Sequence, residues 1–329
     1  DLLEEKIEDI IISSINVNSH ITGDKIGKCL EAEENATGLY VKHLLDTVDY
    51  SLRGKKIVLD CANGAAFQIA EKIYRELGAE VIVIGNQPNG VNINDGCGST
   101  HPERMAETVK MSGADIGLAF DGDADRLIVA DEQGKVIDGD RVIAICARML
   151  KTEGRLAQNK VTATVMSNIG FHKAMEESGI EVDVTGVGDR YVLEQMLKTG
   201  CVIGGEQSGH IIFREYTTTG DGILSSLQFI KAVLNSGKKP SELAAEVEIF
   251  PQVLVNARIN NDYKKTYMND PEIADAISEI EKTMDGSGRV LIRPSGTEPL
   301  VRVMLEGEDE KELFDMARQL ADLIERKLK

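Results

Sequence analysis

The feature that most constrains the fold is an order of strand, turn, helix and strand that occurs twice in the chain. It occupies residues 55–84 and recurs over residues 161–184, where Gly-Ile-Glu-Val-Asp-Val echoes the Gly-Ala-Glu-Val-Ile-Val of residues 78–83. A helix between two apolar strands is the βαβ unit of parallel sheets. Its repetition within one chain indicates related domains. We therefore predict two related α/β three-layer domains, with helices at residues 65–77 and 221–233 and a hairpin of strands at residues 127–137.

Chain length and the pattern near the C-terminus predict a further domain. A chain of 329 residues exceeds one ordinary hydrophobic core. Strands interleaved with two helices near the end predict a smaller α+β domain. We expect α/β domains at residues 35–137 and 138–250 and the α+β domain at residues 251–329. Residues 1–34, which open with the spacing of an amphipathic helix, are interpreted as the remnant of a missing N-terminal domain plus a linker.

The charge balance and the cysteines exclude several functional classes. The net charge is −18, and seven Tyr, seven Phe and no Trp provide no basic face with stacking rings. We therefore expect neither nucleic acid nor a membrane as a partner. The five cysteines are widely spaced and form no C-x-x-C pair, so they indicate neither a disulfide framework nor a zinc site. With no signal peptide pattern, these features predict a cytoplasmic protein.

An acidic loop follows the apolar strand predicted at residues 116–120. Asp121, Asp123 and Asp125 lie within five residues of one another, at the carboxyl edge where open α/β sheets place their ligands. Three carboxylates are typical ligands of Mg²⁺. Arg126 adds a guanidinium for an anion beside the metal. The loop therefore predicts a Mg²⁺ site.

Three other interpretations of this loop stay open on its residues alone. The acidic spacing fits a calcium loop, except that Arg126 occupies the position of the required glycine. A strand that runs into Asp-x-Asp also suggests a haloacid-dehalogenase-type phosphatase, with Asp121 as nucleophile and Asp123 as acid/base. In that class the position of Asp125 normally holds a small hydroxyl residue. The third interpretation is a solvated acidic turn.

A glycine-rich segment at residues 204–210 reads Gly-Gly-Glu-Gln-Ser-Gly-His and is predicted as a loop between strands. Glu206, Ser208 and His210 offer acceptors and donors that suit vicinal hydroxyls. The alternative is a hairpin turn built on glycines, whose polar side chains bind no ligand. Asp189, where a helix is expected to begin, is suitable both as an N-cap and as a ligand contact, and we favour capping.

A second polar loop follows an apolar strand near the C-terminus. Residues 293–299 read Arg-Pro-Ser-Gly-Thr-Glu-Pro, and a further arginine lies on the next predicted strand. Arginines, hydroxyls and exposed backbone N–H groups together form a phosphate cradle. The alternative is a proline-bounded turn whose hydroxyls bond their own backbone. The candidate cradle residues are Arg293, Ser295, Gly296, Thr297 and Arg302.

In this order, the three loops resemble the metal, sugar and phosphate loops of the α-D-phosphohexomutases. The similarity covers about residues 35–329. Ala124 replaces a glycine common in the family's metal loop, which leaves all three carboxylates in place. Gln207 inside the sugar loop is most similar to the amino-sugar members of the family. Two further segments share that similarity, residues 187–192 and 293–304.

The resemblance implies an isomerase that interconverts glucosamine 6-phosphate and glucosamine 1-phosphate through a bisphosphate, with Mg²⁺ as cofactor. It implies that Glu206 and Ser208 hold sugar hydroxyls and that Arg126 steadies the intermediate. A phosphosugar would be the small-molecule partner, and a homodimer is compatible with the family. Phosphomannomutase or phosphoglucomutase activity is the alternative within the superfamily.

One departure from the family pattern concerns the nucleophile. The family begins with another α/β domain, in which the serine of a Thr-Ala-Ser-His-Asn-type loop carries the phosphoryl group. The nearest match here is Asn18-Ser19-His20, which lacks the flanking residues and lies in the predicted linker. We therefore expect the chain to correspond to domains two to four, and to have no mutase turnover alone.

Overall fold

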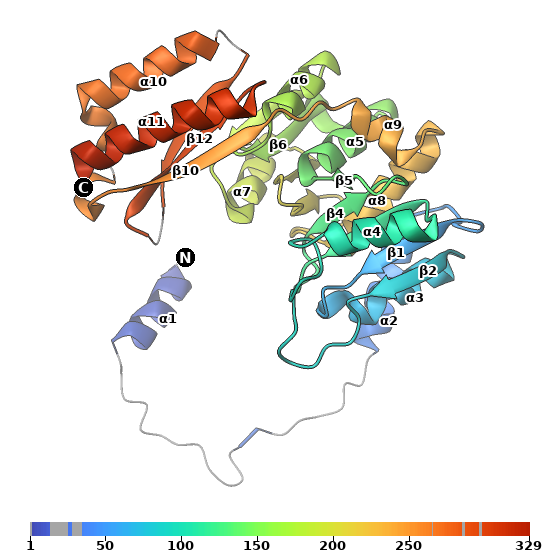
Figure 1. Ribbon diagram of the computed structural model, residues 1–329. Helices are drawn as coiled ribbons and strands as arrows, with labels where there is room; N and C mark the ends of the chain where they lie inside the picture. Colours follow the sequence, from blue (N-terminus) through green and yellow to red (C-terminus); the bar gives the residue numbers. More distant parts are fainter. Residues whose placement is uncertain (1, 14–25, 28–34, 265, 285–286, 296–297) are drawn as a thin grey trace. The chain divides into compact units, whose positions relative to one another are not determined.

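The computed structural model describes residues 2–13, 26–27, 35–264, 266–284, 287–295 and 298–329 (Figure 1). It consists of two compact units, Asp1–Tyr40 and Val41–Lys329. The first unit contains α1 (Leu2–Ile12), the amphipathic helix expected at the N-terminus, with no buried residue. Helix α2 (Ala36–Leu45) spans the boundary between the units. Most of the segment predicted as a linker lies outside the described residues.

The first sheet belongs to the larger unit and has the strand order β2-β1-β3-β4-β5. Strands β1, β2 and β3 are parallel, whereas β4 and β5 form the antiparallel hairpin predicted at its edge. Their bounds are Lys56–Asp60, Glu80–Ile84, Ile116–Phe120, Leu127–Ala130 and Val136–Ile137.

Two helices connect the parallel strands of this sheet. The helix expected at residues 65–77 is divided into a short 3₁₀ turn, η2 (Ala65–Phe67), and α3 (Ile69–Glu76), so its first part was predicted as the wrong helix type. Helix α4 (Glu103–Ser112) begins after Pro102 and contacts β1, β3 and β4. The βαβ prediction is confirmed.

The second sheet repeats the order of the first, as β7-β6-β8-β9. Strand β6 pairs in parallel with β7 and β8, and β9 returns antiparallel to β8. Strand bounds are Lys160–Thr164 for β6, Glu181–Thr185 for β7, Ile203–Gly205 for β8 and Ile211–Phe213 for β9. Helices α6 (Ile169–Glu177) and α7 (Asp189–Thr199) accompany them. The internal repeat is therefore a repeat of topology as well as of sequence.

Helices α5 (Gly139–Thr152) and α8 (Gly222–Ser236) contact each other and both of these sheets. Each buries residues on nearly every side. The sequence predicted α8 but not α5, and it also missed the short α9 (Pro240–Ala245). Helix α5 does carry an amphipathic pattern, with Arg141, Arg148 and Lys151 away from its buried residues, and the sequence prediction did not recognise it.

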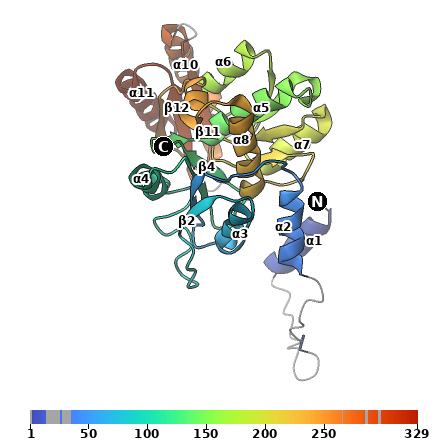
Figure 2. The same ribbon diagram turned by 90° about the vertical axis from the view of Figure 1, so that its right-hand side faces the viewer.

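The third sheet is antiparallel, with the order β10-β12-β11. Its strands are β10 (Gln252–Arg258), β11 (Arg289–Pro294) and β12 (Leu300–Glu306). Alternate residues pack on α10 (Pro271–Met284) and α11 (Glu310–Leu328), which lie side by side (Figure 1 and Figure 2). The predicted α+β arrangement is confirmed.

The described part of the chain contains no helix long and apolar enough to cross a membrane. Four of the five cysteines lie in it, and all four are buried with free thiols. The expectation that they form no disulfide framework is therefore confirmed for these four: Cys61, Cys97, Cys146 and Cys201.

Asp140, in the first turn of α5, is a buried acid among the shared helices. Its Oδ2 accepts a hydrogen bond from the Asn168 N–H at 2.7 Å, while its Oδ1 has no hydrogen-bond partner. Burial, reinforced by the charge of Asp138, raises the pKa of Asp140 to about 7. The folded protein therefore keeps this proton at pH values where an unfolded chain has released it.

Asp140→Asn should stabilise the protein relative to the wild type more at pH 8 than at pH 5. Because the pKa of Asp140 is higher in the folded state, wild-type stability falls as pH rises from the ordinary aspartate range through about 7. Asparagine retains an acceptor for the Asn168 N–H and does not titrate. Thermal unfolding at both pH values measures the difference, with Asp275→Asn on the exposed side of α10 as control. A pH-independent difference would contradict the raised pKa.

Candidate functional site

The acidic loop begins where β3 ends, as predicted. Asp121 is buried, and its Oδ1 accepts a hydrogen bond from the Arg126 N–H at 3.1 Å. Ala124 has a φ of 62°, which turns the chain within the loop. Burial, a hydrogen bond between the two carboxyl groups and the charge of Asp121 all raise the pKa of Asp125. The fold therefore holds two carboxyl groups in contact, an arrangement that a cation would stabilise.

Some of the oxygen atoms of this loop are arranged as the ligands of a hard cation would be, and others are not. Asp125 Oδ1 is buried and accepts no hydrogen bond, although Arg126 Nε lies 3.9 Å away. Asp123 is exposed. Among the described residues no three His, Cys, Asp or Glu side chains are grouped to hold a metal ion. Asp121 and Asp125 are therefore brought together, and the three-carboxylate Mg²⁺ site stays a prediction.

The glycine-rich loop is shorter than predicted, because Gly204 and Gly205 belong to strand β8. A Cβ on Gly204 would lie 2.8 Å from the Thr162 carbonyl oxygen, and one on Gly205 would lie 2.4 Å from that of His210. The close approach of neighbouring backbone explains these glycines. The prediction that placed them in the loop was wrong.

The remaining loop contacts the start of α7. Glu206 Oε1 accepts a hydrogen bond from the Gly188 N–H at 3.0 Å, while Ser208 is exposed. His210 is buried, and its Nε2 lies 3.5 Å from Asp125 Oδ2 and 3.8 Å from Asp189 Oδ2. The histidine thus joins a carboxylate of the acidic loop to one at the start of α7.

Asp189 does not cap α7, contrary to the sequence interpretation. Gly188 is the N-cap, with a φ of 130°, and no side chain makes a capping hydrogen bond there. Asp189 is the first helical residue, and its carboxylate faces His210. Its acidic charge is still suited to a helix N-terminus. The sequence could not separate these two positions, because Gly188 and Asp189 are both acceptable N-caps.

Backbone contacts join the acidic loop to the glycine-rich loop. Arg126 and His210 form an isolated antiparallel bridge. The Leu127 N–H donates to the Gly209 carbonyl oxygen at 3.0 Å. On the other side of the loop, the N–H of Gly222 in α8 donates to the Ala124 carbonyl oxygen at 2.8 Å. The two loops therefore form one site, although they lie on different sheets.

The proposed phosphate loop places two arginines side by side. Arg293 on β11 and Arg302 on β12 are directly opposite in the register. Burial and the charge of Arg302 lower the pKa of Arg293, whereas the charge of Glu206 raises it. Like charges at opposed positions of a sheet are unfavourable. An anion between the two guanidinium groups would relieve this repulsion.

The other predicted members of the phosphate loop are only partly described. Ser295 is buried, and its Oγ accepts a hydrogen bond from the Glu298 N–H at 3.1 Å. Such a bond is the local turn contact that the sequence offered as the alternative. Its O–H remains a donor. Gly296 and Thr297 lie outside the described residues.

A third loop, which the sequence indicated only as a turn, supports the acidic loop. Ala62 and Asn63 have φ values of 52° and 49°. The Ala65 N–H donates to the Gly122 carbonyl oxygen at 2.8 Å, and a Cβ on Gly64 would lie 2.3 Å from that oxygen. The Asn63-Gly64 pair was the only available signal, since it is typical of tight turns. It does not reveal which loop the turn contacts.

Family models match nearly the whole of the larger unit. The α/β/α domain II of phosphoglucomutase/phosphomannomutase matches residues 39–134, domain III matches residues 138–250, and the C-terminal domain matches residues 254–323. The chain belongs to the phosphoglucomutase/phosphomannomutase family. This assignment confirms the resemblance to the α-D-phosphohexomutases and leaves the calcium-loop and phosphatase interpretations without support.

Similar proteins within the family include two phosphoglucosamine mutases. The one from Alkaliphilus metalliredigens (strain QYMF) is 53% identical over 328 residues, and the one from Thermoanaerobacter sp. (strain X514) is 55% identical over 328 residues. Both alignments cover 100% of this chain and 73% of the relative.

Solved structures share the fold at lower identity. N-acetylphosphoglucosamine mutase of Aspergillus fumigatus, in complex with GlcNAc-6P and magnesium, has a TM-score of 0.70 at 19% identity and covers 88% of this chain. A phosphoglucomutase/phosphomannomutase family protein from Burkholderia thailandensis has a TM-score of 0.69 at 23% identity and covers 89%. The chain spans 64% and 65% of these two structures.

Gly209→Ala should separate the acidic loop from the glycine-rich loop. Gly209 has a φ of 96°, and an added Cβ would lie 2.3 Å from the Leu127 carbonyl oxygen. Gly237→Ala is the matched control, because its φ is 67° but no atom lies within 4 Å. Left-handed backbone costs alanine about 1–2 kcal/mol in either variant, and the steric clash should add about 1–3 kcal/mol at Gly209. Urea unfolding measures both; equal losses would contradict the tight contact.

Proposed function

We propose that this chain carries the metal-, sugar- and phosphate-binding parts of a phosphoglucosamine mutase, with glucosamine 6-phosphate as substrate. The observation that best supports this is the joining of the acidic and glycine-rich loops by backbone bonds, together with the arginine pair Arg293–Arg302 on facing positions of the third sheet. The two phosphoglucosamine mutases above support the amino-sugar substrate.

The phosphate of the substrate would bind at the arginine pair. Arg293 and Arg302 supply positive charge and forked donors. Further donors come from the loop between β11 and β12. The proposed phosphate-binding set is Arg293, Ser295, Gly296, Thr297 and Arg302.

The sugar would bind between the arginine pair and the acidic loop. Glu206 and Ser208 are assigned to sugar hydroxyls, since a carboxylate and an exposed hydroxyl suit vicinal hydroxyl groups. His210 and Asp189 lie at the junction with the acidic loop and would contact the substrate there. Binding the phosphate at one end thus directs the opposite end of the sugar toward the acidic loop.

Asp121, Asp123 and Asp125 would hold Mg²⁺. When bound, the ion would neutralise charge on the transferring phosphoryl group. Arg126 would add a second positive charge beside it and steady the bisphosphate. The buried Oδ1 of Asp125, which accepts no hydrogen bond, supports this assignment.

Several finer features belong to the same proposal. The domain limits are taken as residues 35–137, 138–250 and 251–329, and the protein is placed in the cytoplasm. A homodimer stays a prediction. We assign no residue of these 329 as the phosphoryl-transferring nucleophile, and propose that this chain alone binds the phosphosugar without turning it over. Phosphomannomutase or phosphoglucomutase activity is the alternative.

Arg293→Ala should weaken binding of glucosamine 6-phosphate by about 1.5–3 kcal/mol, the range for hydrogen bonds to a charged group. Calorimetry on the wild type and the variant measures this loss. Arg318→Ala is the matched control, because Arg318 lies on the exposed side of α11 and forms a surface ion pair with Asp322.

Glucosamine without phosphate is the ligand control for this experiment. Its affinity should be unchanged by Arg293→Ala, since only the phosphate meets the arginine pair. If glucosamine lost as much affinity as its 6-phosphate, the arginine pair would not be binding phosphate.

A further inference from the structure

The face of the third sheet that points away from α10 and α11 carries three cross-strand rows. In the β10-β12-β11 order, one row is Gln252, Glu306 and Arg289, which we term the anchor row. The cradle row is Asn256, Arg302 and Arg293. An apolar row lies between them: Leu254, Met304 and Leu291.

Strand periodicity places all three rows on one face. The intervening residues of β10, including Val253 and Val255, pack on the helices, so the residues that alternate with them face the other way. Arg289 and Arg293 are four residues apart on β11, which at about 3.4 Å per residue separates the anchor and cradle rows by about 14 Å. The two rows are therefore rigidly connected by the same three strands.

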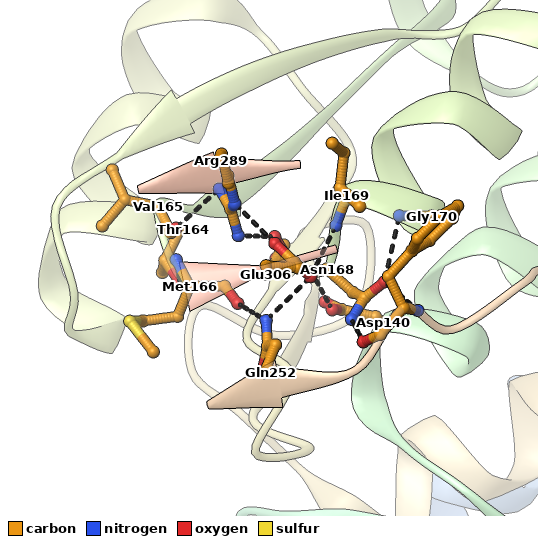
Figure 3. Close-up of polar contacts among 12 residues, drawn as sticks. Asp140, Thr164, Val165, Met166, Asn168, Ile169, Gly170, Gln252, Arg289 and Glu306 are labelled. Carbon is orange, nitrogen blue, oxygen red and sulfur yellow. Dashed lines mark hydrogen bonds and ion pairs between the residues drawn. The ribbon is translucent and has the colours of Figure 1, made fainter. Parts of the chain in front are cut away.

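The anchor row is bound to the segment that follows β6 (Figure 3). Arg289 donates from Nη1 to the Val165 carbonyl oxygen at 3.0 Å and from Nη2 to that of Ser167, while its Nε pairs with Glu306. One guanidinium thus uses three donors on three partners. A lysine has a single ammonium group and cannot reproduce this planar geometry.

Glu306 completes the attachment from a fully buried position. Its Oε1 accepts from the Ile169 N–H at 2.9 Å, at the start of α6, and from Gln252 Nε2 at 3.0 Å. Gln252 Nε2 also lies 3.3 Å from the Met166 carbonyl oxygen. A buried carboxylate with an arginine partner and further donors has a strongly preferred geometry, because any displacement leaves its charge unpaired.

The segment after β6 is itself held in place. The Asn168 side chain bonds both backbone groups of Phe250, donating from Nδ2 to its carbonyl oxygen at 2.9 Å and accepting at Oδ1 from its N–H at 3.0 Å. The Asn168 N–H donates to Asp140 (Figure 3). A Cβ on Gly170 would lie 1.8 Å from the Glu248 carbonyl oxygen. The chain entering β10 is therefore fastened beside the anchor row.

The attachment is made at the edge of the second sheet that carries the sugar loop. Strand β6 pairs in parallel with β8, and β8 leads directly into Glu206. The anchor row therefore fixes the third sheet to the same carboxyl edge from which Glu206 projects. The distance between Glu206 and the cradle row depends on this attachment.

We propose that Arg289, Glu306 and Gln252 are positioning residues that set the distance between the phosphate-binding arginines and the sugar-binding Glu206. In this proposal the three residues contact neither the phosphate nor the sugar hydroxyls. Their role is to let one phosphosugar reach both binding groups at once, so that the site favours a hexose phosphate over a free phosphate ion. This inference rests on the function proposed above and specifies how that site recognises the length of its substrate.

The test compares two ligands, glucosamine 6-phosphate and inorganic phosphate, by calorimetry on the wild type and on Arg289→Lys. Inorganic phosphate needs only the proposed phosphate-binding set and not Glu206, so its affinity should stay within about twofold. The phosphosugar should bind about tenfold more weakly, the equivalent of one lost hydrogen bond to a charged group. Arg318→Lys on the exposed side of α11 is the matched control and should change neither affinity.

Glu306→Gln provides a second variant in case the lysine substitution disturbs folding. It keeps an acceptor for Ile169 and Gln252 but removes the ion pair with Arg289. The same selective loss of the phosphosugar is expected. Retained binding of inorganic phosphate shows in each variant that the third sheet has folded.

The outcomes distinguish this inference from the proposed function. Variants that keep the wild-type preference for the phosphosugar, or that lose both ligands equally, would overturn the positioning role alone. A wild-type protein that binds the phosphosugar no more tightly than phosphate would overturn the proposed function, and this inference with it.

Discussion

The site depends on a short backbone contact between two sheets. The Arg126–His210 bridge and the hydrogen bond from Leu127 to Gly209 join the loop after β3 to the loop after β8. Such bonds need the two backbones to approach closely, which Gly209 permits because it has no Cβ. The buried His210 then lies between two carboxylates, one from the acidic loop and one from the start of α7.

The surrounding helices hold these two sheets together. Helices α5 and α8 contact both sheets. The buried faces of these two helices restrict the relative movement that two separate domains would have. The third sheet is attached differently, through the polar anchor row and the segment after β6. Helix packing and the loop-to-loop backbone bonds thus join the first two sheets, while side-chain hydrogen bonds of the anchor row orient the third, which carries Arg293 and Arg302.

Local sequence patterns predicted the helices and strands whose apolar residues recur at a regular spacing or whose ends are marked by turn residues. The βαβ repeat, the hairpin after the acidic loop and the helices α10 and α11 follow from alternation, amphipathic stripes and turn residues. Helix α5 was missed although Arg141, Arg148 and Lys151 give it a polar side opposite its buried residues. The placement of Gly204 and Gly205 failed because their role is to let neighbouring strands approach, which no local pattern records.

The candidate site residues could be predicted as types but not as contacts. Carboxylates after a strand and arginines beside a proline-bounded turn indicate the chemistry of each loop. Their mutual arrangement could not be predicted, because it depends on pairs far apart in sequence, such as Ile169 with Glu306. The anchor row consists of ordinary strand residues, so only the register of β10, β11 and β12 identifies it.

The most direct measurement is a crystal structure of the chain with Mn²⁺, as a substitute for Mg²⁺ with anomalous scattering, and glucosamine 6-phosphate. We expect an anomalous peak from a Mn²⁺ ion held by Asp121, Asp123 and Asp125. We also expect the phosphate between Arg293 and Arg302, with sugar hydroxyls at Glu206. A metal bound elsewhere, or a phosphosugar that does not contact the arginine pair, would contradict the claim that the three loops form one site.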